Sequence, residues 1–141
     1  DGMDLDWEWP GSEGNTGNVV RPEDKENFTL LAAEFRRQLD EYGTQTGRHY
    51  SLTAFLPADP AKIAAGIQIG PLLASMDFVT VQGYDFVGPW NATTGHQSNL
   101  YSTPQHPFSV DLAVQTYLSA GAPAAKLVVG IPYYGKGWTG V

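Results

Sequence analysis

The sequence predicts an α/β fold built on a parallel sheet. Four strand-like runs alternate with helix-like runs along the 141 residues, which is the pattern of consecutive βα units. The last run, residues 127–131, is apolar throughout, as expected for a strand that is buried on both faces. Two architectures share this order of elements, an open doubly wound sheet and an eightfold βα barrel, and these observations leave both open.

The predicted strands cover residues 2–8, 52–56, 78–84 and 127–133. The helix after the first strand has the clearest pattern. Pro22 suits its first position, and the acidic residues that follow complement the positive end of the helix dipole. Its apolar residues fall on one stripe at helical spacing: Phe28, Leu31, Ala32, Phe35, Leu39 and Tyr42. Gly43 is expected to end this helix in a left-handed conformation.

Two further helices are expected. One begins near Asp59 and is broken by Gly66 and by the Gly70-Pro71 pair. The other runs from about residue 110 to residue 120 and is capped by Ser109. The segment 87–108 between them is long, polar and rich in Gly, Asn and Pro. A long loop directly after a strand is more often functional than idle.

Composition excludes several classes of function. The 8 basic and 15 acidic residues give a net charge of -7, a poor match to nucleic acid or to an anionic membrane. There is no cysteine, so neither a disulfide nor a zinc–thiolate site can form. No apolar run approaches the roughly 20 residues that span a bilayer. Neither a GxGxxG fingerprint nor a P-loop is present, which argues against nucleotide binding. A neutral substrate and no cofactor are therefore expected.

The first predicted strand carries an acidic row. At a period of two residues, Asp4, Asp6 and Glu8 share one face, and Trp7 and its apolar neighbours share the other. The apolar row should pack under the helices, so the acidic row faces the centre of the sheet or barrel. Buried carboxyl groups in a row cannot all ionise cheaply, and they share protons. Glu8 lies closest to the carboxyl end of its strand, where such enzymes keep their active sites.

A protonated carboxylic acid at that place suits cleavage of a glycosidic bond. Two other interpretations of the acidic row are a solvated edge strand and a site for magnesium or calcium. The apolar character of the opposite face argues against the edge strand. The three histidines, His49, His96 and His106, show no ligand spacing and are expected on the surface or in loops, so no metal site is predicted.

Three segments resemble motifs of family 18 glycoside hydrolases, the chitinases. Residues 1–10, DGMDLDWEWP, resemble the DGxDxDWExP signature at every fixed position. Residues 82–85, QGYD, resemble the MxYD element that ends the sixth barrel strand, and residues 130–138 resemble the GxPFYGRxW element that ends the seventh. The resemblance implies a partial (β/α)8 TIM barrel of about four βα units, strands four to seven. Residues 1–141 are then expected to be a fragment of a single catalytic domain.

The resemblance also implies roles for the matching residues. Glu8 would be the general acid/base. Asp6 would orient the N-acetyl group of the substrate, and Asp4 would lie beneath it and share the proton. The hydroxyl of Tyr84 would bind the acetamido group, and Asp85 would contact sugar hydroxyls. In this family the acetamido oxygen of the substrate itself attacks the anomeric carbon, which gives an oxazolinium ion and retention of configuration.

Four more residues are expected to bind substrate. Gln82 and Lys136 depart from the family pattern, which usually has Met and Arg there. Gln82 could hydrogen-bond a sugar hydroxyl, whereas Lys136 donates as a point charge without the bidentate fork of Arg. Trp90 is expected to stack on a sugar at the leaving-group side, and Tyr134 is placed at the site. Elsewhere, Trp7 is assigned to core packing, and Trp9 and Trp138 are left open.

The resulting expectation is a secreted chitinase, monomeric as the full-length enzyme, that acts on chitin or chitooligosaccharides. A sugar-binding relative that has lost catalysis is the main alternative, although its usual loss of the acid is not seen, since Glu8 is present. An endoglycosidase that acts on N-glycans is the second alternative. Half a barrel has two open edges and an exposed inner face, so the 141 residues alone are not expected to form a stable, active enzyme.

Overall fold

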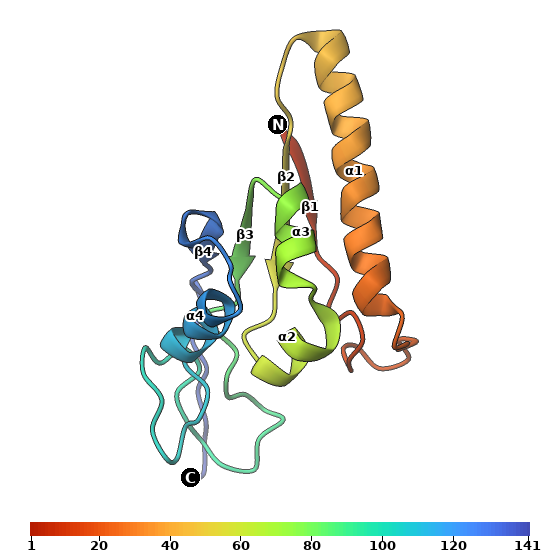
Figure 1. Ribbon diagram of the computed structural model, residues 1–141. Helices are drawn as coiled ribbons and strands as arrows, with labels where there is room; N and C mark the ends of the chain where they lie inside the picture. Colours follow the sequence, from red (N-terminus) through yellow and green to blue (C-terminus); the bar gives the residue numbers. More distant parts are fainter.

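The computed structural model describes residues 1–141, and its centre is a four-stranded parallel sheet (Figure 1). The strands are β1 (Gly2–Leu5), β2 (Ser51–Leu56), β3 (Phe78–Val81) and β4 (Leu127–Val129). They lie in the order β1-β2-β3-β4, each parallel to its neighbour in the sequence. The predicted α/β class is confirmed. The order does not reverse, unlike that of a doubly wound sheet, and the sheet is not closed.

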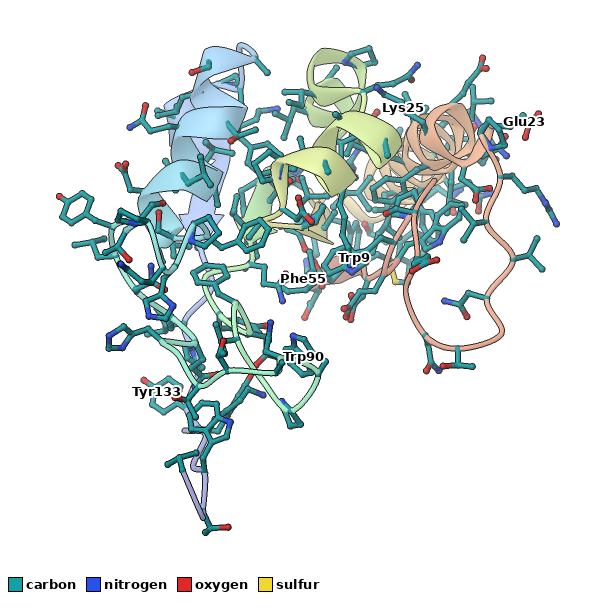
Figure 2. The ribbon with its side chains drawn as sticks, turned by 90° about the horizontal axis from the view of Figure 1, so that it is seen from below. Trp9, Glu23, Lys25, Phe55, Trp90 and Tyr133 are labelled. Carbon is teal, nitrogen blue, oxygen red and sulfur yellow. The ribbon has the colours of Figure 1, made fainter.

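Four helices connect and cover the strands. They are α1 (Asp24–Thr46), α2 (Pro60–Gly66), α3 (Ile69–Ser75) and α4 (Val110–Ser119), and a 3₁₀ turn, η1 (Ala124–Lys126), precedes β4. Figure 2, which is turned so that the molecule is seen from below, shows these helices on one side of the sheet. A barrel segment has this one-sided arrangement, whereas a doubly wound sheet carries helices on both faces. None of the helices has both the length and the apolar character needed to cross a membrane.

The core lies between the sheet and these helices. Leu52, Ala54 and Leu56 of β2 are buried, and the alternate residues of this strand are only partly covered. Phe28 and Ala32 of α1 are buried against the same layer, and Phe35 and Leu39 are partly buried there, in agreement with the predicted stripe. Leu31 and Tyr42, which the stripe also included, are 42% and 52% exposed. The opposite face of the sheet carries no helix, and it is therefore the face available to a ligand.

The end of α1 differs from the prediction. The helix continues through Gly43 and ends at Gly47, which has a φ of 69° and donates its N–H to the carbonyl of Gly43. Gly43 has another reason to lack a side chain: a Cβ there would lie 2.5 Å from the carbonyl oxygen of Arg48. Two glycines near one helix end therefore have different functions, and only Gly47 supplies the left-handed stop.

The second helical region is divided as predicted at one position but not at the other. Asp59 caps α2 by accepting a hydrogen bond from the N–H of Ala61, and the helix ends at Gly66. Gly70 and Pro71 do not break a helix. They lie in the first turn of α3, where proline is tolerated because no backbone N–H is needed. Ser109 caps α4 as predicted, by accepting from the N–H of Leu112 at 3.0 Å.

Three of the strands are shorter than predicted, and each loses residues at its carboxyl end. The hydrogen-bonded ladders stop at Leu5, Val81 and Val129, although an isolated bond from the N–H of Gln82 to the carbonyl of Leu56 extends the pairing at 2.9 Å. The residues beyond these ends need not continue in the direction of the strands. These are the segments that contain the predicted site residues.

Candidate active site

The three carboxylates of the N-terminal segment lie on the face of the sheet that has no helices. Asp4, Asp6 and Glu8 are all exposed. The sequence predicted a buried row, and this is wrong for the chain described here, because no part of these 141 residues covers the inner face of the open sheet. The hydroxyl of Thr53, the residue paired with Asp4 on β2, donates a hydrogen bond to the Asp4 carboxylate.

The carboxyl group of Glu8 has a raised pKa. Partial burial raises its pKa above the ordinary value, and the charge of Asp6 and a hydrogen bond with Asp6 raise it further. The ammonium group of Lys62 lowers the pKa, and the charge of Asp85 raises it. Glu8 therefore keeps its proton at pH values at which an ordinary glutamate has lost it, as a general acid requires.

A row of aromatic rings crosses the carboxyl ends of the strands. Trp9 packs on Phe55 with ring centroids 5.7 Å apart, Phe55 stacks on Tyr84 at 6.0 Å, and Tyr84 meets the edge of Tyr134 at 6.1 Å. The row joins segments that follow or end all four strands. It supplies an apolar floor beside the carboxylates, of the kind on which sugar rings stack.

The two tryptophans of the N-terminal segment point to opposite sides. Trp7 packs edge-on against Phe28 of α1 at 5.8 Å, which confirms its assignment to the core. Strict alternation would put Trp9 on the same side as Trp7. The alternation does not extend that far because β1 ends at Leu5, and Trp9 is buried against Phe55 on the side of the carboxylates.

Tyr84 presents a hydroxyl group that stays protonated. Its burial raises the pKa, and the negative charges of Glu8, Asp85 and Asp6 raise it further, in that order. These three carboxylates are therefore near enough to influence the Tyr84 hydroxyl electrostatically. A neutral phenol in such a place can donate a hydrogen bond to a carbonyl oxygen of a ligand.

A groove of about 680 Å³ opens beside Glu8. Four of the predicted site residues line it: Glu8, Gln82, Asp85 and Trp90. The structure thus brings together residues from the first segment, from the end of β3 and from the long loop 87–108. The expectation that this loop contributes to the site agrees with its position, since Trp90, Asn91 and Phe108 also line the groove.

Of the five predicted residues that do not line the groove, Tyr134 and Lys136 lie at its edge, near Asp85 and Trp90. The Nζ of Lys136 lies 2.9 Å from Oδ1 of Asp85 and 5.0 Å from the centroid of the Trp90 ring. Tyr134 is also close to Asp85. Burial, a hydrogen bond with Asp85 and the charge of Asp85 raise the pKa of the Tyr134 hydroxyl to about 12. Asp85 itself has a φ of 59°, which turns the chain sharply at this point.

Sequence reasoning did not single out Phe55, Lys62 or Glu13. Phe55 could have been found, because it is a large aromatic residue on the same face of its strand as Thr53, near the carboxyl end. Lys62 could not, since its place 5.4 Å from the Trp9 ring depends on how α2 packs. Glu13 lies in an irregular loop and lines the groove with Glu8.

No group of three or more His, Cys, Asp or Glu side chains is arranged to hold a metal ion.

Comparison with known proteins agrees with this geometry. The sequence profile of the glycosyl hydrolases family 18 matches residues 1–141. Chitinase A1 of Niallia circulans is 42% identical over 149 aligned residues, which cover 99% of this chain and 21% of that protein. The chain thus spans only about a fifth of this relative.

Solved structures give the same result. The catalytic domain of the psychrophilic chitinase B from Arthrobacter TAD20 superposes with a TM-score of 0.85 and 48% identity over 92% of this chain and 32% of that one. A family 18 N-acetylglucosaminidase from Paenibacillus barengoltzii superposes with a TM-score of 0.85 and 40% identity, over 92% of this chain and 38% of that one. The open sheet thus corresponds to part of the barrel of such domains. The chain belongs to family 18 of the glycosyl hydrolases.

Proposed function

We propose that the protein of which this chain is part hydrolyses the β-1,4 linkages between N-acetylglucosamine units of chitin or chitooligosaccharides. The observation that supports this most directly is the carboxyl group of Glu8, which is hydrogen-bonded to Asp6 and lines a groove next to a row of aromatic rings. The relatives add support by name, since Chitinase A1 of Niallia circulans and Chitotriosidase-1 of Mus musculus match nearly the whole chain.

The proposed reaction begins with a proton transfer from Glu8. The acid donates its proton to the glycosidic oxygen, the bond from that oxygen to the anomeric carbon breaks, and the leaving sugar departs as an alcohol. The acetamido oxygen of the substrate forms the new bond to the anomeric carbon, which gives an oxazolinium ion. Water then attacks that carbon and gives a proton to the Glu8 carboxylate, and the bond from the carbon to the acetamido oxygen breaks, so that the acetamido group and the acid are restored and the configuration is retained.

The neighbours of Glu8 suit a mechanism without an enzyme nucleophile. Asp6 is close enough to Glu8 to raise the pKa of its carboxyl group, and the proposed reaction needs no carboxylate across the scissile bond. In our proposal Asp6 instead orients the acetamido nitrogen, and the protonated hydroxyl of Tyr84 holds the acetamido group. Asp4 supports Asp6 from below. Asp85 would bind sugar hydroxyls.

The groove residues would hold the rest of the substrate. Trp90 is 63% exposed, which leaves ring surface for a sugar on the leaving-group side. Gln82 lines the same groove and carries both a donor and an acceptor for hydroxyl groups. Tyr134 completes the aromatic row at the far end.

The test uses the protein expressed from its complete gene and a fluorogenic chitobiose or chitotriose substrate. Glu8→Gln removes the transferable proton and should lower kcat by about 10²–10⁴-fold, the usual contribution of a general acid/base. Glu13→Gln is the matched control: it removes a carboxylate from the same groove and should leave most of the activity. Full activity in Glu8→Gln would show that the proposed mechanism is wrong.

The same assay separates the alternatives. Binding of chitotriose without turnover by the unsubstituted protein would indicate a sugar-binding relative. Release of glycans from an N-glycoprotein at a higher kcat/KM than chitotriose would indicate an endoglycosidase.

We also propose that the complete protein is secreted, because chitin is an insoluble polymer that an enzyme must reach outside the cell. We propose in addition that the complete protein is a monomer. Activity that remains with the cells of its source, and not in the medium, would contradict secretion. A mass above that of one chain in light scattering would contradict the monomer.

A further inference from the structure

The ammonium group of Lys136 lies where two loops meet. Its Nζ is 2.9 Å from Oδ1 of Asp85, 5.0 Å from the centre of the Trp90 ring and 5.3 Å from the centre of the Tyr134 ring. Asp85 and Trp90 belong to the segment after β3, whereas Tyr134 and Lys136 belong to the segment after β4. The Lys136 side chain is only 19% exposed, so its charge is already surrounded by protein groups.

Trp90 has a well-defined backbone but a ring with few fixed neighbours. The N–H of Asn91 donates to the carbonyl of Gly88 at 3.0 Å, and the Oδ1 of Asn91 accepts from the N–H of Gly88 at 3.0 Å. A Cβ at Gly88 would lie 2.4 Å from the far end of the indole, so the ring lies close against the backbone of this turn. The ring is nevertheless 63% exposed. In Figure 2, Trp90 lies on the same side of the sheet as Trp9 and Phe55, away from the helices.

We propose that Lys136 is a positioning residue that fixes the Trp90 ring and the Asp85 carboxylate at the edge of the groove. One cation attracts the face of an indole and the charge of a carboxylate at the same time, and it joins the two loops that carry them. The inference rests on the proposed function, because it takes a chitooligosaccharide as the ligand that Trp90 receives. It differs from the expectation that Lys136 donates directly to the substrate.

Two features favour this role over direct binding. The carboxylate of Asp85 and two aromatic rings already occupy the surroundings of the ammonium group, so donation to a sugar would compete with an existing ion pair. The position of Lys136 against Trp90 also has a geometric consequence: the ammonium covers one part of the indole, and the exposed remainder faces solvent in a fixed orientation. A ring that is held before the ligand arrives loses less conformational entropy on binding.

The experiment measures binding without hydrolysis. The complete protein carrying Glu8→Gln is titrated with chitohexaose by calorimetry, alone and with Lys136→Met, Trp90→Ala or both. Lys136→Met should weaken binding about two- to five-fold, the loss expected for one exposed cation–π contact. In the Trp90→Ala background the same substitution should have less than half of this effect on the free energy of binding. Lys136→Arg, which keeps the charge and can stack on the indole, should bind within about two-fold of the parent.

The outcomes that overturn the inference are distinct. An unchanged affinity in Lys136→Met, or an equal loss with and without Trp90, would show that Lys136 does not act through the indole. Lys62→Met is the matched control, because its ammonium lies 5.4 Å from the ring of a different tryptophan, Trp9. Its effect should be the same with and without Trp90, and a similar non-additivity would mean that the coupling reflects charge alone. No chitohexaose binding in any variant would overturn both this inference and the proposed function.

Discussion

Glu8 is subject to opposing influences from its charged neighbours. Burial, Asp6 and Asp85 favour the protonated acid, and Lys62 favours the carboxylate. These neighbours come from three segments: Asp6 from its own segment, Lys62 from α2, and Asp85 from the end of β3. The acidity of one residue is therefore set by tertiary structure as well as by the local motif.

The pH profile of hydrolysis should reveal these influences. In the proposed mechanism Glu8 is the acid, so kcat/KM should fall as the pH rises through the pKa of Glu8 in the free enzyme. Lys62→Met removes an influence that lowers this pKa, so the alkaline limb should move to higher pH. Asp6→Asn removes the charge that raises it, so the limb should move to lower pH, in addition to the loss of rate. Profiles of the complete protein check both signs, and shifts in the same direction would contradict this account of the Glu8 environment.

The sequence could predict several residues of the candidate site but not all of their surroundings. Asp6, Glu8 and Tyr84 occupy fixed positions in short motifs, although the strand whose alternation was used to place the two acids on one face ends before them, at Leu5. The positions of Lys62 and Trp9 follow from how α2 packs and from where β1 ends, and neither is a local property. The burial of the acidic row was predicted wrongly, since burial depends on what covers a face.

The helices show the same division between local and non-local information. The start of α2 near Asp59 and the cap of α4 at Ser109 were predicted, because both side chains act on backbone groups within three residues. The end of α1 was predicted at Gly43 and found at Gly47, because a glycine can be required for close approach as well as for a left-handed turn. Only the packing of residue 48 against the helix distinguishes these two reasons.

Two glycine substitutions should therefore change stability in opposite directions. Gly47→Ala puts a side chain on a residue with a φ of 69° and should cost about 1–2 kcal/mol of unfolding free energy. Gly70→Ala, inside α3, adds a Cβ that meets no atom within 4 Å and should stabilise by about 0.5 kcal/mol. Urea unfolding of the complete protein measures both changes. Equal signs would contradict the assignment of Gly47 as the left-handed stop.

At the scale of the whole molecule, the two faces of the sheet differ. The helices bury one face of it, and the other face carries the carboxylates and the aromatic row. Apolar side chains near the open β4 edge are exposed: Val128 by 46%, Ile131 by 66% and Tyr133 by 96%. The α/β class was predictable from alternating patterns, because each pattern reflects contacts within one βα unit. Choosing the barrel required the family resemblance, because closure depends on strands that local patterns do not describe.

The exposure of this face leads to a prediction for residues 1–141 produced alone. Two unpaired strand edges and exposed apolar side chains favour self-association over a unique monomer. The relatives match this chain over only about a fifth to a third of their length, so they contain further segments. We therefore expect the isolated chain to aggregate or to unfold without a cooperative transition, and to show no turnover of fluorogenic chitobiose. Light scattering, thermal unfolding and the assay test this beside the complete protein. A monomeric chain that unfolds cooperatively and turns over substrate would show that four βα units suffice for the site.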